Sequence, residues 1–452
     1  MGKFLYAITF VILLPIALVA WARATSSAIT LPTPRVPIVG YSLAAIGIAI
    51  ILESMRELWF KGGGLPMNAY PPARLVKSGL YALIPHPIYA GFCAACFGCS
   101  IATGSSGGLW LVTPIVILGC IALVKGYEGP ALRARFPESL PPTRSADAHP
   151  GSPPFHTRIW LCGLRGCERI ANSWTCWHIG PVRIINYAAY AGLAAAVGAF
   201  VSVSLAGPEH AWHICGIALA ALIGAALSEQ VLVGSPTLLR PFGYFGAIAG
   251  AASALIAIAL IQGVERFWIL AAALCVAAPW VVIIGRLRCL VQGCCHGRAC
   301  ESGMGIRYRH PLSRACRIAN LYNISTHPTP LYSMISNVGI GLVLAGLWSV
   351  SAQHSMIAGL YLVLAGLARF VEESLRGEPQ TKTVAGLHTY QWFAVISVIA
   401  GAWLTSVSTT CASALIEWNW SAAYMAIGVG AVYAFAMGID FPKSNRLYSR
   451  LT

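Results

Sequence analysis

The sequence predicts an all-α polytopic membrane protein with about twelve transmembrane helices arranged in two helical modules. Hydrophobic types make up 57% of the 452 residues and charged types only 10%, whereas soluble domains average about 25% charged residues. The mean hydropathy is +0.69. This composition excludes a soluble globular enzyme, a disordered chain and a secreted disulfide scaffold. Basic cytoplasmic loops account for the net charge of +15, because such loops of membrane proteins are rich in Lys and Arg. We therefore expect no nucleic-acid partner.

Apolar runs of roughly 20 residues are needed to cross a bilayer, and about twelve such runs occur. They lie near residues 4–22, 38–56, 80–102, 107–126, 184–205, 211–233, 244–263, 267–287, 329–350, 355–373, 389–410 and 418–438. We interpret the first run as a span and not as a signal peptide, because it is long and Lys3 is the only charge before it. Pro85-His86-Pro87 interrupts the third run.

The basic residues segregate to one side of these predicted spans. With the N-terminus inside, the inner segments hold all but three of the 30 Lys and Arg residues, and the outer segments hold only Arg23, Arg35 and Arg266. The positive-inside rule therefore predicts a multi-pass protein of the plasma or bacterial inner membrane with both termini in the cytoplasm. One miscounted span would invert everything after it.

The chain divides into two predicted membrane modules joined by a linker. The boundaries are 1–140 for a four-helix module, 141–177 for the linker, 178–440 for the second module and 441–452 for a basic tail. Residues 137–154 are rich in Pro, Ser and Ala, which indicates an exposed linker. From Phe155 to His178, Trp and Arg residues mix in a way that is typical of a helix lying in the interface. A solvated loop is the alternative.

The informative stretch of the first module runs from Lys61 to Gly91. It opens with a Gly- and Pro-rich loop and continues through a Gly-x-Tyr turn to His86-Pro87-x-Tyr89-x-Gly91 at the mouth of a span. Glu128 follows the fourth span. Ionisable groups at such depths are costly and usually functional. A His, a Tyr and a Glu at cytoplasmic helix ends therefore predict a site for a polar ligand that enters from water.

This stretch resembles the isoprenylcysteine carboxyl methyltransferase and phospholipid methyltransferase superfamily over about residues 38–140. The resemblance implies S-adenosylmethionine as a cofactor. The cofactor-binding residues that it implies are Tyr81, His86, Tyr89, Gly91 and Glu128. The chain departs from the family pattern at Pro85, where Arg is usual, and at Gly129, where a second Glu is common. A degenerate module that is retained for folding or partner contacts remains the alternative.

The second module carries its charges at the ends of spans. GRLRCLVQGCCHG, residues 285–297, ends the eighth span, and GLARFVEESLRGEP, residues 366–379, ends the tenth. In the latter, Arg369, Glu373 and Arg376 share one helical face. Because guanidinium forks match phosphate oxygens, we expect Arg286, Arg369 and Arg376 to hold a phospholipid head group, with Glu373 orienting one arginine. The alternative is an Arg–Glu pair that only fixes helix register.

These segments, together with His327-Pro328-x-x-Leu331-Tyr332, resemble the prolipoprotein diacylglyceryl transferase family over about residues 178–410. Its members move diacylglycerol from phosphatidylglycerol onto a cysteine thiol and release glycerol phosphate. The resemblance implies a transferase that needs no cofactor in this module. The implied catalytic residues are Arg286, His327, Arg369 and Glu373, and the implied substrate-binding residues are Arg376, Tyr332, Gln292 and Gly293. Phe245 stands where the family usually has His, which leaves His327 or His296 as the candidate proton acceptor.

The loop after the eighth span is rich in Cys and His, the residue types that bind zinc. It holds Cys289, Cys294, Cys295, His296, Cys300, His310 and Cys316. This loop has no Cys-x-x-Cys pair, and the adjacent Cys294 and Cys295 are a poor geometry for one ion. We therefore predict no metal site.

The function predicted from these observations is transfer of a (diacyl)glyceryl group from an anionic phospholipid such as phosphatidylglycerol to an acceptor, with a methyltransferase-like module fused to the transferase. The first alternative is a methyltransferase that uses the second module to bind lipid. The second is a non-catalytic lipid-binding or transport protein. Residues 288–328 fall on the predicted cytoplasmic side, so we expect a cytosolic or lipid acceptor; the sequence does not identify it.

Overall fold

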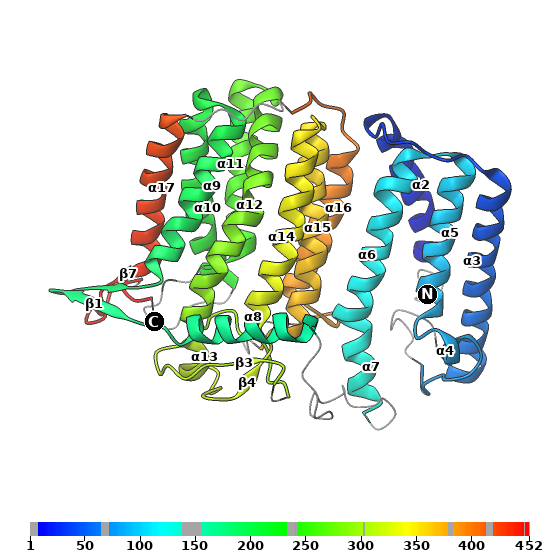
Figure 1. The fold of residues 1–452 in the computed structure, drawn as a ribbon, viewed down its shortest axis with the longest axis horizontal. Coiled ribbons are helices and arrows are strands. Elements are labelled where there is room, and N and C mark those ends of the chain that lie inside the picture. Colours follow the sequence, from blue (N-terminus) through cyan, green and yellow to red (C-terminus); the bar gives the residue numbers. More distant parts are fainter. Residues whose placement is uncertain are drawn as a thin grey trace. The chain divides into compact units, whose positions relative to one another are not determined.

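The computed structural model confirms an all-α polytopic membrane protein (Figure 1). The structure describes residues 8–64, 72–137, 155–232, 240, 242–301, 303–377, 383–412, 419–446 and 448–451. Ten of the described helices are long and apolar enough to cross a membrane. The chain forms two compact units, of which the first comprises Met1–Thr143 with Val398–Ser408 and the second Arg144–Ser397 with Thr409–Thr452.

The predicted number of twelve spans is not confirmed. Helices α5 (Pro87–Thr103) and α16 (Thr389–Thr405) stand at the third and eleventh predicted positions, and each has 17 residues, which is short of the roughly 20 that a span needs. Helix α5 is short for a local reason. Pro87 occupies its first position, and Gly104, with φ of +66°, ends it in the left-handed conformation, so neither end extends.

The first unit is a small helical bundle. Its elements are η1 (Ile8–Leu13), α2 (Leu14–Thr25), η2 (Ser26–Ala28), α3 (Pro37–Glu57), η3 (Leu58–Gly62), α4 (Leu80–Leu83), α5, η5 (Gly108–Val112), α6 (Thr113–Leu123), η6 (Val124–Glu128) and α7 (Gly129–Arg135). Helices α3 and α5 approach closely: a Cβ at Gly47 would lie 2.5 Å from the carbonyl oxygen of Gly91. Small residues permit such contact. Residues 65–71 of the Gly- and Pro-rich loop lie outside the described residues.

The second unit is built around α12 (Val264–Gln292), a helix of 29 residues that packs against α9, α11, α14 and α15. The other helices of this unit are α8 (Phe155–Ala171), α9 (Ala188–Ala206), η7 (Pro208–His210), α10 (Ala211–Leu232), α11 (Tyr244–Gln262), α13 (Arg314–Arg317), α14 (Thr329–Ser349), α15 (His354–Leu375) and α17 (Trp420–Gly438). The charged ends of α12 and α15 and the start of α14 therefore come together.

Short strands fix the ends of these helices. Strands β1 (Cys176–Ile179), β2 (Val182–Ile185) and β7 (Ile439–Asp440) form an antiparallel sheet in the order β1-β2-β7. Strand β3 (Ile306–Arg307) pairs with β4 (Ser325–Thr326), and β5 (Thr383–Val384) pairs with β6 (Leu387–His388). A buried ion pair of 2.6 Å joins Arg183 to Asp440. The predicted basic tail folds back here, because Leu451 is buried and its backbone N–H donates to Asp440 Oδ2.

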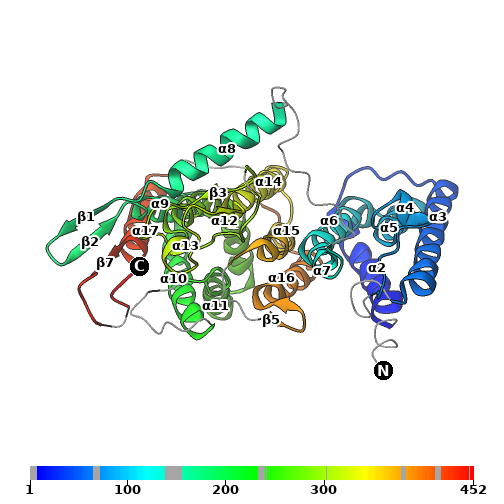
Figure 2. The same ribbon diagram turned by 90° about the horizontal axis from the view of Figure 1, so that it is seen from below.

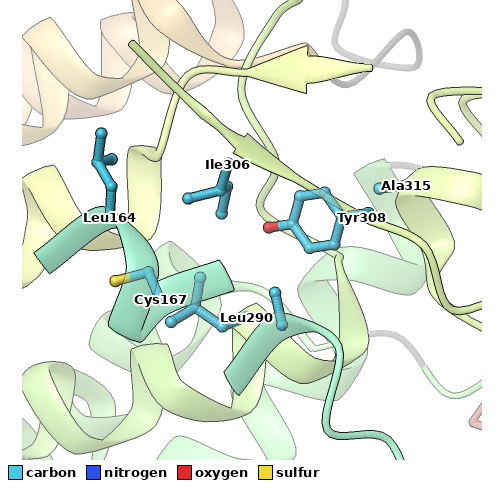
Figure 3. Packing of buried hydrophobic residues seen from close by; sticks show 7 residues of the cluster. Leu164, Cys167, Leu290, Ile306, Tyr308 and Ala315 are labelled. Carbon is cyan, nitrogen blue, oxygen red and sulfur yellow. The ribbon is translucent and has the colours of Figure 1, made fainter. Parts of the chain in front are cut away.

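Residues 155–171 form a helix and not the alternative loop. Figures 1 and 2 show α8 running crosswise to the long helices of its unit. One face of α8 packs into a cluster formed by Leu164, Cys167, Ala171, Leu290, Ile306, Tyr308 and Ala315 (Figure 3). Arg158, Arg165 and Arg169 are exposed on the other face. Residues 138–154, which include the first part of the linker predicted at 141–177, lie outside the described residues, so the predicted domain boundaries stay a prediction.

Candidate functional site

A network of arginine and glutamate side chains joins three helices of the second unit. Arg286 of α12 donates from Nη2 to both carboxylate oxygens of Glu372 at 3.0 Å, and from Nε to Ser333 Oγ of α14 at 2.9 Å. Glu372 lies on α15 and also accepts from Arg369 Nη1 at 2.9 Å. The guanidinium of Arg286 is thus oriented by two neighbouring helices before any ligand binds.

The network continues along α15 to its end. Arg369 Nη2 donates to Glu373 Oε2 at 2.5 Å, and Arg376 Nη1 lies 3.6 Å from the same oxygen. The side chains of these charged residues are between 2% and 11% exposed. These three guanidinium groups and two carboxylates together carry one net positive charge on largely buried side chains. A buried charge of this kind calls for an anion.

Arg376 does not sit on the helical stripe that the spacing predicts. Helix α15 ends at Leu375, and Arg376 has an extended backbone with φ of −72° and ψ of 146°. It forms an isolated β-bridge with Gly297, and the backbone N–H of Arg298 donates to the carbonyl of Leu375 at 2.9 Å. The side chain still reaches Glu373 because the bridge holds this segment beside the end of α15.

A small, partly open pocket lies beside the network. Its polar lining includes Arg286, Arg369, Glu372, Ser333 and Asn337, and its apolar lining consists of Val282, Ala365 and Ala368. The Nε atom of Arg369 is buried and has no hydrogen-bond acceptor among the described residues. Buried donors are normally satisfied, which makes this atom an exception within the network. The pocket beside it combines guanidinium groups with apolar lining.

His327 lies beside Gly297, the residue that bridges to Arg376, and its backbone N–H donates to the carbonyl of Arg298 at 2.9 Å. Its Nδ1 lies 3.3 Å from the hydroxyl of Tyr332, and the Tyr332 ring stacks on Trp160 of α8 with ring centroids 5.9 Å apart. Burial, followed by the charge of Arg298, lowers the pKa of His327, and burial likewise lowers the pKa of His296. Both imidazoles are therefore neutral at pH 7 and able to accept a proton.

Gln292 and Gly293 make contacts within the fold. Gln292 is buried, and its Nε2 donates to the carbonyl of Leu451 at 3.4 Å. Gly293 ends α12 with φ of +67°, and a Cβ there would lie 2.1 Å from Ser313 Oγ. These contacts give both residues structural roles, and substrate contact by them stays a prediction. Phe245 packs among aromatic rings, with centroids 5.8 Å from Tyr390 and 5.3 Å from Phe393.

Sequence reasoning missed Glu372, which bridges Arg286 and Arg369. The signal was present in part, because Glu372 stands three residues after Arg369, and side chains at this spacing meet on a helix. Its contact with Arg286 of another helix has no sequence signal. Ser333, Asn337 and Tyr244 were missed for the same reason: nothing in a polar residue of an apolar run shows which cavity it lines.

The first unit holds a second, larger pocket, which is also partly open. Tyr81, His86, Tyr89 and Glu128 all line it, which places four of the five predicted cofactor-binding residues together. His86 Nδ1 lies 3.7 Å from Glu128 Oε2, and this oxygen is buried without a hydrogen-bond donor among the described residues. The fifth predicted residue, Gly91, instead lies in the contact between α5 and α3.

Two family models match the chain. The model for prolipoprotein diacylglyceryl transferase matches residues 175–407, which is more than half of the 452 residues. The chain belongs to the prolipoprotein diacylglyceryl transferase family. It is a multi-pass membrane protein and a transferase, as the sequence predicts. The model for phospholipid methyltransferase matches residues 36–139, which agrees with the resemblance of the first module to that superfamily.

Two clostridial members of the diacylglyceryl transferase family are similar to this chain. Phosphatidylglycerol–prolipoprotein diacylglyceryl transferase of Clostridium tetani (strain Massachusetts / E88) is 24% identical over 212 residues, which cover 43% of this chain and 80% of that protein. Phosphatidylglycerol–prolipoprotein diacylglyceryl transferase 2 of Clostridium perfringens (strain 13 / Type A) is 27% identical over 125 residues, which cover 27% of this chain and 46% of that protein. The match therefore spans less than half of the second relative.

Proposed function

We propose that the second module transfers a diacylglyceryl group from phosphatidylglycerol to an acceptor and releases glycerol phosphate. The observation that carries this proposal is the pair of buried guanidinium groups, Arg286 and Arg369, which line one pocket together with apolar side chains. The net positive charge and the unsatisfied Nε of Arg369 suit the phosphate of an anionic lipid. The names of the two clostridial relatives give the same substrate.

The transfer needs a stabilised leaving group more than a strong base. The nucleophile of the acceptor forms a bond to the glyceryl carbon, the bond between that carbon and the phosphate oxygen breaks, and the electron pair leaves with glycerol phosphate. Charge then increases on the phosphate, and oriented guanidinium donors in a water-poor site stabilise it. Glu372 and Glu373 hold these donors in place. The proton of the acceptor passes to a neutral imidazole, for which His327 and His296 are the candidates.

The experiment is release of glycerol phosphate from head-group-labelled phosphatidylglycerol by the purified full-length protein in detergent. Arg369→Lys keeps the positive charge but removes the planar guanidinium group, which can donate two parallel hydrogen bonds to a phosphate. Arg309→Lys makes the same change at a pair with Glu168 where Arg309 is 51% exposed. We expect release to fall by about 100-fold or more in Arg369→Lys and to stay unchanged in Arg309→Lys. Equal release by the two variants would refute the proposal.

The acceptor separates two versions of this proposal. The distribution of basic residues favours a cytosolic or lipid acceptor, whereas the names of the relatives specify a prolipoprotein. Incubation of labelled phosphatidylglycerol with membranes that contain the protein, followed by separate analysis of lipid and protein fractions, tests this. Label in a new lipid supports the cytosolic or lipid acceptor, and label on a lipoprotein cysteine overturns it while leaving the transferase assignment intact.

We further propose that the first module binds S-adenosylmethionine and transfers its methyl group. The support is the match to the phospholipid methyltransferase model and the pocket lined by Tyr81, His86, Tyr89 and Glu128. The buried, unsatisfied oxygen of Glu128 fits the hydroxyl groups or the positive charge of this cofactor. When bound, the cofactor supplies an electrophilic methyl group, and the residues of the cavity contribute by aligning it with the acceptor.

Calorimetric titration of the detergent-purified protein with S-adenosylmethionine tests the second proposal. We expect a saturable heat for the wild type, a heat reduced at least tenfold in Glu128→Gln, and wild-type behaviour in Glu53→Gln. Glu53 is a matched control because its pair with Arg56 is exposed. Absence of heat at millimolar cofactor, or equal binding by Glu128→Gln, would end this proposal without affecting the transferase.

A further inference from the structure

Three cysteines gather at the C-terminal end of α12. The sulfur atoms of Cys289, Cys294 and Cys295 all lie within 4.8 Å of one another, and those of Cys294 and Cys295 are 3.7 Å apart. All three thiols are free and partly buried. Neither the phosphate-binding network nor the methyltransferase cavity uses them.

The turn after α12 creates this arrangement. Gly293 adopts φ of +67°, a left-handed conformation that reverses the chain directly after the helix. The reversal brings the two thiols that follow it back toward Cys289 in the last helical turn. Thr329 Oγ1 donates to the carbonyl of Cys295 at 2.6 Å, which fixes the reversed segment to the start of α14. The sequence analysis predicted no metal site because the sequence does not show the reversal, which brings Cys289 close to the adjacent Cys294 and Cys295.

The sulfur positions match the needs of one thiophilic ion. A zinc–sulfur bond is about 2.3 Å long, so sulfurs around one ion lie about 3.8–4.0 Å apart in tetrahedral or trigonal geometry. The pair at 3.7 Å already meets this spacing. The limit of 4.8 Å for the whole set leaves a contraction of about 1 Å at most. Rotation about the Cα–Cβ bonds of cysteine accommodates such a change.

The surroundings compensate the charge of such a site. Three thiolates around a divalent ion carry one net negative charge, and around a monovalent ion two. Arg286 and Arg288 lie within electrostatic reach of the Cys289 thiol. Arg288 is buried and sits over the ring of Tyr187 at 5.2 Å. The cluster is therefore placed among fixed positive charges, which favour bound thiolates.

We propose that Cys289, Cys294 and Cys295 bind one thiophilic metal ion of the zinc(II) or copper(I) class. Soft thiolate ligands select these ions. Among the described residues, the cluster has no fourth ligand from His, Asp or Glu, so the ion is three-coordinate or takes one water. The ion ties the last turn of α12, the helix that carries Arg286, to the segment directly after Gly293, which is fixed to the start of α14 by Thr329. Its role is structural and does not depend on the proposed transfer reaction.

Metal binding by the full-length protein in detergent tests this proposal. The protein is reduced, freed of metal with a chelator, and titrated separately with Zn²⁺ and with Cu⁺ under anaerobic conditions. Bound metal per chain is measured by elemental analysis after desalting. We expect one ion per chain for the wild type and for Cys162→Ser, an exposed cysteine outside the cluster. Chelator competition identifies which of the two ions binds more tightly.

Loss of one thiol is expected to weaken binding by on the order of 100-fold, because even outer-shell changes weaken metal sites by 10- to 100-fold. Cys294→Ser and Cys289→Ser are both made, and each is checked for a monodisperse elution profile. Thermal unfolding of the wild type with and without the ion needs no variant, and we expect a higher midpoint with metal. No binding by the reduced wild type overturns the proposal. Metal binding that is unchanged in both serine variants also overturns the proposal. A disulfide that forms within the cluster while metal is present overturns it as well.

Discussion

Glu372→Gln is the sharpest test of the arginine network. Glu372 accepts hydrogen bonds from Arg286 and Arg369, so neutralising it raises the net charge of the buried network from +1 to +2. Removing one partner from a buried ion pair costs about 3–5 kcal/mol. The glutamine keeps the volume and one carbonyl acceptor, so we expect a loss near 3 kcal/mol. This loss lowers the ratio of folded to unfolded protein by about 100-fold.

The assay compares two variants with the same chemical change. Glu168→Gln removes the charge from a pair with Arg309 that is 2.7 Å long but lies at the surface, where ion pairs contribute about 0–1 kcal/mol. Thermal unfolding and release of glycerol phosphate are measured for both variants in the same detergent. We expect a large stability loss and loss of release only for Glu372→Gln. If both variants unfold at the same temperature, the buried network does not exist as the structure describes it.

Three further predictions follow from other parts of the molecule. Burial lowers the pKa of His296 and His327, so the unfolded chain binds more protons than the folded chain as the pH falls below about 6.5. The unfolding temperature should therefore fall between pH 7.5 and pH 5.5. If the pH dependence is undiminished in a His327→Asn variant, His327 does not contribute to it. Gly47→Ala places a Cβ 2.5 Å from the carbonyl oxygen of Gly91, and we expect it to destabilise the first unit by about 1–3 kcal/mol. In the control variant Gly119→Ala, the new Cβ meets nothing within 4 Å, so its unfolding temperature should equal that of the wild type. The exposed Cys411 and Cys162 allow the orientation of the chain in the membrane to be tested. A membrane-impermeant maleimide applied to intact cells should label Cys411 and not Cys162. The reverse labelling pattern would contradict the predicted topology.

Local pattern accounts for what the sequence predicts well. An apolar run identifies a span because the bilayer imposes a length of about 20 residues on any helix that crosses it. The pair of Arg369 and Glu373 follows from their spacing of four residues on one helix. Tyr81, His86 and Tyr89 lie within a few residues of one another in the sequence, and they line one pocket. Helix ends were harder, since Pro87 and Gly104 shorten α5 inside a longer apolar run.

Long-range pairing decided the rest. Arg286 and Glu372 are 86 residues apart in the chain, Arg183 and Asp440 are 257 apart, and Gln292 meets the carbonyl of Leu451. Hydropathy does not predict such partners, because the local sequence around a polar residue in an apolar run is the same whichever helix that residue contacts. The left-handed turn at Gly293 likewise brings Cys289 close to Cys294 and Cys295, which their spacing in the sequence does not show. Composition and periodicity determined that this chain spans a membrane, and its motifs carried the resemblance to a transferase family, whereas helix packing alone determined which charges and thiols meet.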